Sequence, residues 1–333
     1  MDRHLPTVIT KPNEPMHIDI FNGDADGICA LHQYRLKNKR AESRLITGVK
    51  RDIQLLRQIE DIKQCTVTVF DISLDSNRPF LEKILSNNNS VCYYDHHFAG
   101  AIPNVPLLES HIDPSPDTCT SLIVNSVTGE SHSLWAVCGA FGDNLHQSAL
   151  SLAEKLNLSV RQTGLLQELG ELFNYNGYGT SLTDLLFHPL DLYKAIQNYK
   201  NPFDFLENTQ IIAELRATYD EDLAKAMQQE KIATTGKNGI YTFPNKPWAR
   251  RISGVFSNFC ARKNPQAAHV ITIENDDETL MVSVRAPLDD KQDADTLCKR
   301  FPTGGGRAAA AGVNRLPAAM LDQFIEQFNI LYK

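Results

Sequence analysis

The sequence predicts an α/β protein in which an N-terminal domain with a parallel sheet is followed by a helical linker and a smaller α/β domain with a mixed sheet. Three observations support this fold class. Short β-rich runs alternate with helical patterns from His17 to Asp95, residues 148–229 are almost wholly helical in pattern, and short strand patterns return after residue 236. Alternation of strands and helices is typical of a parallel sheet covered on both faces.

The N-terminal domain is predicted to contain four strands, and each of them ends at polar residues. The strand patterns cover residues 17–21, 67–70, 91–94 and 134–138. Apolar side chains recur at helical spacing in the segments 28–39, 52–62, 79–85 and 118–127, and the third of these segments begins with Pro79. The proline-containing segment 111–117 is predicted to be a loop.

The remainder of the chain changes from helices back to short strands. Apolar residues between Ile211 and Met227 predict a long helix that links the domains. Strands are predicted at residues 240–243, 269–273 and 280–285, and helices at residues 255–261, 293–300 and 317–331. We therefore place the domains at residues 1–185 and 236–333, with the linker at residues 186–235. Residues 1–16 contain three prolines and are expected to form a loose or strapping segment.

Acidic and imidazole side chains follow the four predicted strands. Asp24 and Asp26 follow the first strand, Asp71 the second, the run Asp95–His97 the third, and Asp143 the fourth. Ligands of open α/β sheets bind at the carboxyl edge of the strands, and carboxylates crowded there repel one another unless a cation lies among them. Oxygen ligands with one imidazole suit Mn²⁺ or Mg²⁺, so the pattern predicts a metal centre at this edge.

Each of these residues also has a structural interpretation. Asp24 and Asp26 fit an Asx turn, Asp71 and Asp143 fit helix caps, and His96 fits a buried core histidine. The occurrence of all five at predicted strand ends favours the metal centre over five separate structural roles.

Four motifs stand in an order that resembles the signature motifs of the DHH phosphoesterase superfamily. They are Asp24-Ala25-Asp26-Gly27, Asp71, Asp95-His96-His97 and Gly142-Asp143. The run Gly304–Gly312 resembles the glycine motif of the DHH-associated C-terminal domain, so the resemblance extends from residue 22 to residue 312. It implies a metal-dependent hydrolase of phosphoric ester bonds that uses one or two Mn²⁺ ions, with Mg²⁺ as the alternative.

The resemblance also implies roles for single residues. The metal ligands would be Asp24, Asp26, Asp71, His96 and Asp143. Asp71 would bridge two ions and His97 would contact the scissile phosphate, which makes these two the expected catalytic residues. Asn22 and Asp95 are expected to support the ligands from outside the metal's own shell. Ile20 stands where many members have a histidine, and Asn22 where RecJ-like exonucleases have an acid, so the first ion is expected to be held more weakly.

In the second domain, the resemblance predicts substrate binding by Gly304, Gly305, Gly306, Arg307 and Arg285. Consecutive glycines let backbone N–H groups approach a phosphate. Arg307 replaces the family's usual histidine, so it is expected to bind phosphate without serving as a general acid. The structural alternative for the glycines is a flexible turn before an alanine-rich helix. Arg262 and the pair Arg250–Arg251 are interpreted as solvated surface charges.

Composition narrows the class of substrate. The net charge of −7 argues against a general nucleic-acid binder. Residues 236–333 carry 13 Lys and Arg against 10 Asp and Glu, which leaves a net +3 there and −10 on residues 1–235. This distribution favours a small anion between the two parts over a long duplex. Seven scattered cysteines without a CxxC pair, no apolar leader and no membrane-length apolar run predict a cytoplasmic protein without a membrane partner.

The resemblance is greatest to short two-domain members of the superfamily, the oligoribonucleases and pGpG hydrolases. The expected partner is therefore a short linear RNA dinucleotide, and the expected reaction is hydrolysis of pGpG to GMP. The alternatives are a nanoRNase or phosphatase of 3′-phosphoadenosine 5′-phosphate, an exopolyphosphatase, and an inactive nucleotide-binding regulator. The base preference, the oligomeric state and the physiological pathway are left open.

Overall fold

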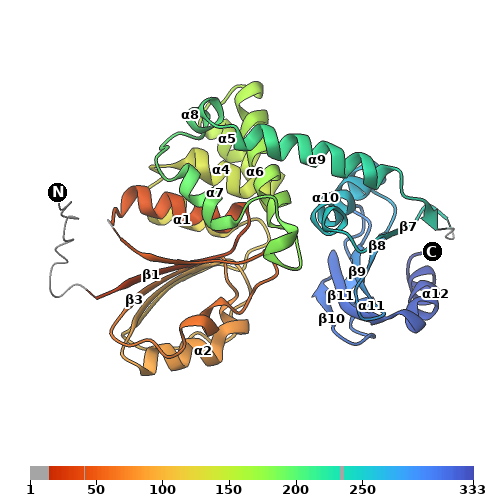
Figure 1. Cartoon of the computed structure of the whole chain (residues 1–333), viewed down its shortest axis with the longest axis horizontal. Coiled ribbons are helices and arrows are strands. Elements are labelled where there is room, and N and C mark those ends of the chain that lie inside the picture. Colours follow the sequence, from red (N-terminus) through yellow and green to blue (C-terminus); the bar gives the residue numbers. More distant parts are fainter. Residues whose placement is uncertain (1–14, 41, 233–235) are drawn as a thin grey trace, which may run out of the picture.

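The computed structural model describes residues 15–40, 42–232 and 236–333, and confirms the α/β fold class. A five-stranded sheet lies in the N-terminal lobe and a six-stranded sheet in the C-terminal lobe (Figure 1). The segment expected to be loose or strapping lies, up to residue 14, outside the described residues. Within the described residues, no helix is long and apolar enough to span a membrane.

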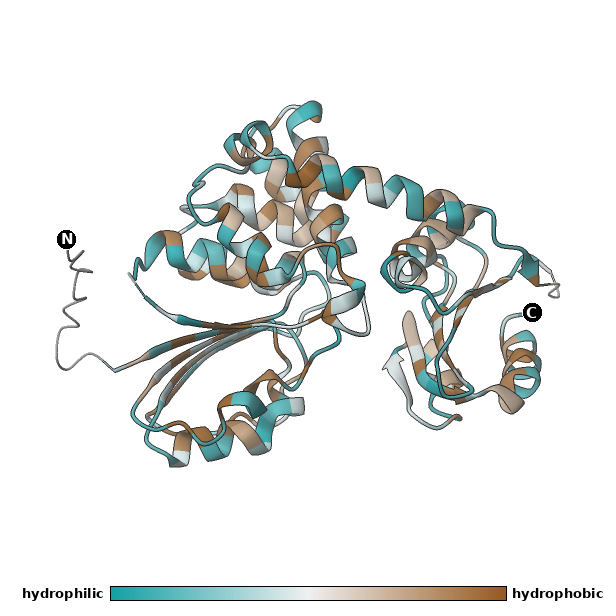
Figure 2. Ribbon diagram, in the orientation of Figure 1, coloured by the Kyte–Doolittle hydropathy of each residue, from teal (hydrophilic) through white to brown (hydrophobic). Residues whose placement is uncertain are grey.

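The first sheet is entirely parallel, with the strand order β2-β1-β3-β4-β5. Its strands are β1 (His17–Phe21), β2 (Arg44–Ile46), β3 (Thr66–Phe70), β4 (Ser90–Asp95) and β5 (Leu108–Ile112). Helix α2 (Leu74–Ser86) and the 3₁₀ helix η1 (Leu55–Ile59) cover one face, and α1 (Ala25–Lys37) lies on the other (Figure 1). The strands are largely hydrophobic along their length (Figure 2) because both faces are buried.

Alternate residues of the strands pack into two different hydrophobic cores, one on each face of the sheet. Ile18, Val67 and Tyr93 pack in the core beneath α2 and η1, whereas Phe70 and Tyr94 pack in the core shared with α1. Both groups are buried, and this alternation follows from the two-residue period of a strand. The parallel register fixes the carboxyl ends of β1, β3 and β4 at one edge of the sheet.

A buried ion pair joins β1 to α1, on the face of the sheet that α1 covers. Arg35 Nε donates to Asp19 Oδ2 at 2.8 Å, and the His17 ring lies 3.1 Å from Asp19 Oδ1. Burial alone would raise the pKa of Asp19, but the His17 hydrogen bond and the Arg35 charge lower it overall. The Asp19 carboxylate is therefore ionised in the folded state, and its charge stabilises the fold at pH values above the ordinary aspartate pKa.

The predicted fourth strand is wrong, because residues 134–138 lie in helix α4 (Ser133–Gly142). All residues of α4 except Leu134 are buried, and its apolar character on every side gives no helical period to recognise. The helix packs against α1 and against α6 (Val160–Gly177). A Cβ on Gly142 would lie 2.3 Å from the Ala25 Cβ and 2.9 Å from the Gly170 carbonyl oxygen, so only glycine allows this approach.

Other predicted boundaries also differ from the structure. Helix α2 begins at Leu74, where the Ser73 side chain accepts from Ser76 N at 3.3 Å, so Pro79 lies inside the helix and does not open it. The predicted helix 52–62 is reduced to η1, and the predicted loop 111–117 begins within β5. Local capping and strand pairing set these boundaries, and neither leaves an apolar period in the sequence.

The middle of the chain is helical, as predicted. Its helices are α3 (Thr120–Val127), α4, α5 (His146–Lys155), α6, the 3₁₀ helix η2 (Leu182–Asp184), α7 (Pro189–Ile196), α8 (Pro202–Asn208) and α9 (Ile211–Met227). Helix α9 is the predicted long linking helix, and it runs from the N-terminal lobe to the C-terminal lobe (Figure 1). The limits 1–185, 186–235 and 236–333 stay a prediction.

The second sheet is mixed and has the order β10-β11-β9-β8-β7-β6. Its elements are β6 (Lys231–Ile232), β7 (Gly239–Phe243), α10 (Pro247–Lys263), β8 (His269–Glu274), β9 (Thr279–Arg285), α11 (Ala294–Cys298), β10 (Gly304–Arg307), β11 (Ala310–Pro317), the 3₁₀ helix η3 (Ala318–Met320) and α12 (Leu321–Leu331). Only β7 and β8 pair in parallel. The alanine-rich run enters strand β11, so the alternative of an alanine-rich helix is wrong.

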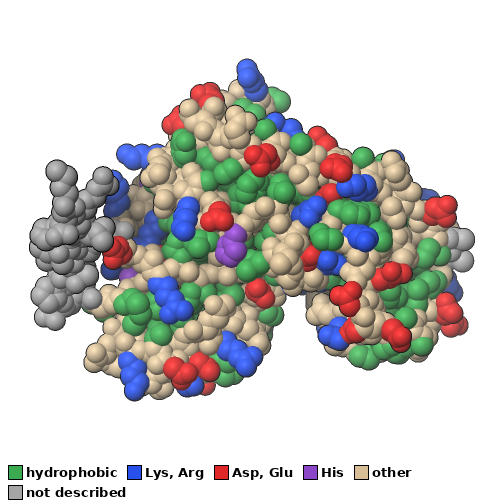
Figure 3. Space-filling view, in the orientation of Figure 1, with side chains coloured by type: hydrophobic (Ala, Val, Ile, Leu, Met, Phe, Trp, Pro, Cys, Tyr) green, Lys and Arg blue, Asp and Glu red, His purple; other side chains and the backbone are tan. Residues whose placement is uncertain are grey.

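Two arginines interpreted as solvated charges instead fasten the lobes together. Arg250 of α10 forms an ion pair with Asp184, with a 2.7 Å distance from Nη2 to Oδ1. Arg251 Nη2 lies 2.8 Å from Asp222 Oδ2, and the Asp222 side chain is 1% exposed. Asp222 belongs to α9, and the molecule is notched between the lobes on the side away from α9 (Figure 1 and Figure 3). The interpretation as surface charge is therefore wrong for Arg250 and Arg251.

Candidate metal centre and the adjoining pocket

The turn between β1 and α1 supplies two of the predicted ligands. Asp24 is the N-cap of α1 and its Oδ1 accepts from Gly27 N at 3.1 Å. Asp26 lies in the first turn, where its two oxygens accept from the backbone N–H groups of Thr120 and Ser121 at 2.8 and 2.7 Å. The structural interpretation of Asp24 therefore holds for Oδ1, which caps α1. The second oxygen of Asp24, Oδ2, accepts from Lys50 Nζ.

The other three predicted ligands meet at the same place. His96, just after β4, has its Nε2 3.4 Å from Asp71 Oδ1 and 3.7 Å from Asp143 Oδ2. Asp71 follows β3, whereas Asp143 is the C-cap of helix α4, so the centre is built from strand ends and one helix end. Asp71 is not a helix cap, because Ser73 caps α2. Its φ of 58° is a left-handed conformation that aspartate tolerates better than β-branched residues do.

Crowding of carboxylates shows in their protonation equilibria. Burial, with the charges of Asp24 and Asp26, raises the pKa of Asp71 well above its ordinary value. Burial also raises the pKa of Asp26, although the nearby His96 opposes this. Asp24 differs, because the Lys50 ammonium outweighs burial and lowers its pKa. A cation among Asp71 and Asp26 would relieve this repulsion.

Asp95 and His97 form a pair beside the centre. Asp95 Oδ1 lies 2.7 Å from the His97 Nδ1 and also accepts from His96 N at 2.9 Å. Burial opposes protonation of His97, but the hydrogen bond and charge of Asp95 raise its pKa. Asp95 therefore orients the His97 ring and the backbone that carries His96, and it does not bind the ring of His96 itself.

The donor set fits a divalent cation. Asp71, His96 and His97 each offer a ligand atom within 4.8 Å of the others. Asn22 lies at the same turn with its Oδ1 buried, and this oxygen accepts no hydrogen bond from the described residues. Carboxylate, amide and imidazole donors of this kind suit Mn²⁺ or Mg²⁺. Within the predicted set, Asp71 and His96 are the residues best placed to hold an ion, because both oxygens of Asp26 accept backbone hydrogen bonds.

One residue without a sequence signal lies inside this centre. The Lys50 Nζ is 2.5 Å from Asp24 Oδ2, 2.9 Å from Asn174 Oδ1 and 3.6 Å from Asp143 Oδ1. Burial opposes its charge, yet Asp24 above all raises the pKa of Lys50 well above the ordinary value. An isolated lysine in a turn carries no periodicity or motif, so nothing in the sequence marks it as part of the centre.

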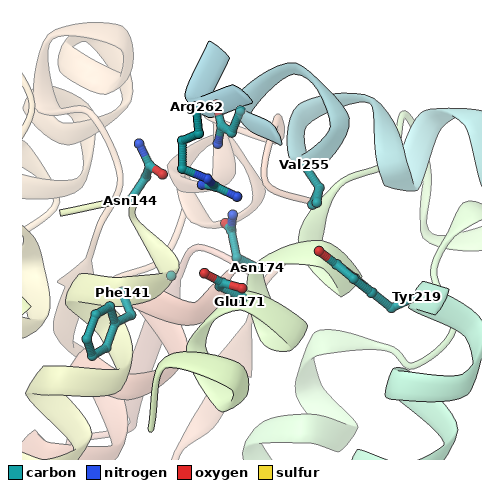
Figure 4. A pocket seen from close by; sticks show the side chains of 9 residues that line it. Phe141, Asn144, Glu171, Asn174, Tyr219, Val255 and Arg262 are labelled. Atoms are coloured by element: carbon teal, nitrogen blue, oxygen red, sulfur yellow. The ribbon is translucent and has the colours of Figure 1, made fainter. Parts of the chain in front are cut away.

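A pocket adjoins the centre and opens between the lobes. Gly142 and Asn144 flank Asp143 on one wall, and Asn174 of α6 is shared with the Lys50 site. Helix α10 supplies Val255, Asn258 and Arg262 on the facing wall. The Arg262 side chain is exposed, as the surface-charge interpretation expects, and it extends from α10 toward Asn174 and Glu171 at the rim of the pocket (Figure 4).

Arg285 connects this pocket to the second sheet. Its Nε donates to Asn258 Oδ1 at 3.0 Å, and its Nη1 to Val284 O at 3.2 Å, so neither acceptor carries a charge. Burial and the charge of Arg285 lower the pKa of Arg51, which contacts Met281 Sδ through Nη1 at 2.7 Å. Arg51 of the N-terminal lobe thus contacts β9, the strand that ends at Arg285.

The glycine motif forms edge strand β10 and not a loop. Gly304 and Gly306 are required by packing, since a Cβ on them would lie 1.8 Å from Cys298 O and 2.4 Å from the Ala311 Cα. Gly305 differs, because a Cβ there would meet no atom within 4 Å. In the sheet register, Arg307 pairs with Ala310, which pairs with Arg285, so both arginines lie in one row.

Three solved structures show what the chain is similar to. One is a DHH domain described as a member of the s1p family of ribosomal proteins (TM-score 0.63, 12% identity, covering 94% of this chain and 85% of that one). Another is exonuclease RecJ bound to manganese (0.61, 14%, 95% and 90%). The third is RecJ in complex with Mn²⁺ from Thermus thermophilus (0.58, 15%, 95% and 52%). No family model and no curated protein sequence matches the chain.

Proposed function

Because the chain has the fold of the DHH phosphoesterase superfamily, we propose that it is a metal-dependent phosphodiesterase for short linear ribonucleotides, with pGpG as the preferred substrate. The observation that carries the proposal is the meeting of His96 with Asp71 and Asp143, at 3.4 and 3.7 Å, beside a pocket that adjoins both lobes. Similar solved structures include manganese-bound RecJ, which supports Mn²⁺ as the metal.

The residues of the N-terminal lobe bind and orient the reacting group. Asp71 and His96 would hold the cation, and a bound divalent ion would supply a water of lowered pKa and neutralise phosphate charge. His97, oriented through its Nδ1 by Asp95, donates from its other ring nitrogen, Nε2, to a non-bridging phosphate oxygen. Asp71, held by Thr120 Oγ1 at 3.2 Å, keeps its carboxylate directed into the centre.

The C-terminal lobe binds the far end of the substrate. Arg262 lines the pocket, and Arg285 donates to Asn258, which also lines it. Gly305 leaves open space over β10, where a phosphate can approach the backbone. A substrate held at both ends is favoured when its length equals the distance between the two grips.

The pocket and the charge favour a small substrate. The pocket is lined by nine residues, which suits a small ligand. The net charge of −10 on residues 1–235 opposes the passage of a long polyanion. A dinucleotide therefore satisfies the site better than a long RNA.

A substrate panel tests the proposal. The purified chain with MnCl₂ is incubated with pGpG, pApA, 3′-phosphoadenosine 5′-phosphate, polyphosphate and a ribonucleotide of about 10 residues, a length chosen to exceed the pocket. Losing one phosphate contact costs about 1.5–3 kcal/mol, so we expect kcat/KM for pGpG to exceed that for the longer RNA by roughly ten- to a hundredfold. Equal values for pGpG and the longer RNA contradict the length selection. If none of the five compounds is hydrolysed, the proposed phosphodiesterase activity is contradicted.

A further inference from the structure

The Lys50 ammonium occupies a shell made from residues predicted to bind metal. It lies 2.5 Å from Asp24 Oδ2 and 3.6 Å from Asp143 Oδ1, and Asn174 Oδ1 completes the shell at 2.9 Å. The ammonium donates hydrogen bonds to Asp24 and Asn174, and Asp143 is close enough to pair with its charge. The Tyr178 ring covers the group, with its centroid 5.5 Å from Nζ.

The position of Lys50 is fixed by its backbone as well as by its charge. Lys50 N donates to Gly177 O at 2.9 Å, and Lys50 O accepts from Asn22 Nδ2 at 3.3 Å. The Lys50 side chain is 24% exposed and the Asp24 side chain 2%. A lysine anchored on both sides and paired with a buried carboxylate has little freedom to swing into solvent.

The Lys50 ammonium also occupies a carboxylate oxygen that could otherwise bind a metal ion. Asp24 Oδ1 accepts from Gly27 N, and Oδ2 accepts from Lys50, so both oxygens of this predicted ligand are engaged. Ile20, at the position where the resemblance expects an imidazole, is buried in the apolar core beneath α2 and presents no donor to the centre. The side of the centre near Asp24 thus lacks one ligand and already holds a positive charge.

We infer that Lys50 is a built-in cation that takes the place of one of two divalent ions, so that the centre binds a single ion at Asp71 and His96. The inference rests on the proposed metal-dependent function. Lys50 neutralises Asp24 and part of the Asp143 charge, which a second ion would otherwise do. The remaining crowded pair, Asp71 and His96, lies on the side where no lysine is bound.

The test counts bound ions without measuring activity. The metal-free full-length chain is titrated with MnCl₂, and free Mn²⁺ is followed by its electron paramagnetic resonance signal. We expect one tight site in the wild-type chain and in Lys50→Arg, and two sites in Lys50→Met. Lys83→Met is the matched control and should bind one ion, because its ammonium pairs with Asp61 at 2.8 Å far from the centre.

The outcomes separate this inference from the proposed function. Two tight sites in the wild-type chain, or a single site in folded Lys50→Met, contradict the role of Lys50 and leave a metal enzyme intact. No bound Mn²⁺ in any folded variant contradicts the metal-dependent function itself. Circular dichroism reports folding, and the wild-type count decides the matter if Lys50→Met does not fold.

Discussion

Replacement of Arg251 by methionine should loosen the junction between the lobes. The guanidinium donates Nε and Nη2 to Asp222 Oδ2 at 3.0 and 2.8 Å, and Nη1 to Asp184 O at 2.7 Å. Removing one partner of a buried ion pair costs about 3–5 kcal/mol. Tyr175 still donates to Asp222 at 2.5 Å, and Lys225 Nζ stays at 3.8 Å, so we expect the lower end, about 3 kcal/mol.

Urea unfolding measures this loss. With a slope of about 3 kcal/mol/M, the midpoint should fall by about 1 M. Arg216→Met is the matched control, because its pair with Glu168 is exposed, at 47% and 33%, and such pairs contribute about 0–1 kcal/mol. Adding Asp222→Asn to Arg251→Met should recover part of the loss, since no buried charge then lacks a partner. Equal losses below about 1 kcal/mol for Arg251→Met and Arg216→Met would refute the account of the junction.

Three further substitutions test single sites. Gly305→Ala should raise KM for pGpG about tenfold without loss of stability, as expected for one weakened phosphate contact, whereas exposed Gly164→Ala in α6 should leave KM unchanged. Arg285→Met should raise KM by roughly ten- to a hundredfold, whereas exposed Arg315→Met should not; equal KM values for the two variants would remove Arg285 from the site. Asp19→Asn should destabilise the chain at pH 7, because the folded pKa of Asp19 is lowered by an imidazole and a guanidinium despite its burial. That stabilisation is present above the unfolded pKa of 3.8 and is lost as pH falls through the folded value, so urea midpoints of both chains should converge in acid; a constant difference would contradict it.

The sequence was sufficient where a strand end or a long apolar period marks an element. Asp71 and His96 meet because β3 and β4 are adjacent parallel strands, and their carboxyl ends follow from the strand patterns. The linking helix Ile211–Met227 was predicted from its apolar spacing alone. These features depend on local pattern and on the rules of parallel sheets.

Other features depend on contacts between distant segments and left no local signal. Helix α4 was mistaken for a strand because it is buried on nearly all sides, yet it brings Asp143 to the same centre from a helix end. Arg250 and Arg251 resemble surface charges in sequence, and only their contacts across the junction show otherwise. Lys50 reaches Asn174 across 124 residues, a separation that no motif spans.

The metal response of Asp71→Asn tests the central claim most directly. Asparagine keeps the shape and removes the charge, so the metal-free variant should fold at least as well as the wild-type chain, because burial and neighbouring carboxylates raise the Asp71 pKa. Free Mn²⁺ at 100 times its dissociation constant should stabilise the wild-type chain by about 2.7 kcal/mol. The account predicts that Asp71→Asn loses most of this stabilisation together with pGpG hydrolysis. Wild-type stabilisation by Mn²⁺ and wild-type turnover in that variant would contradict a metal centre at this edge.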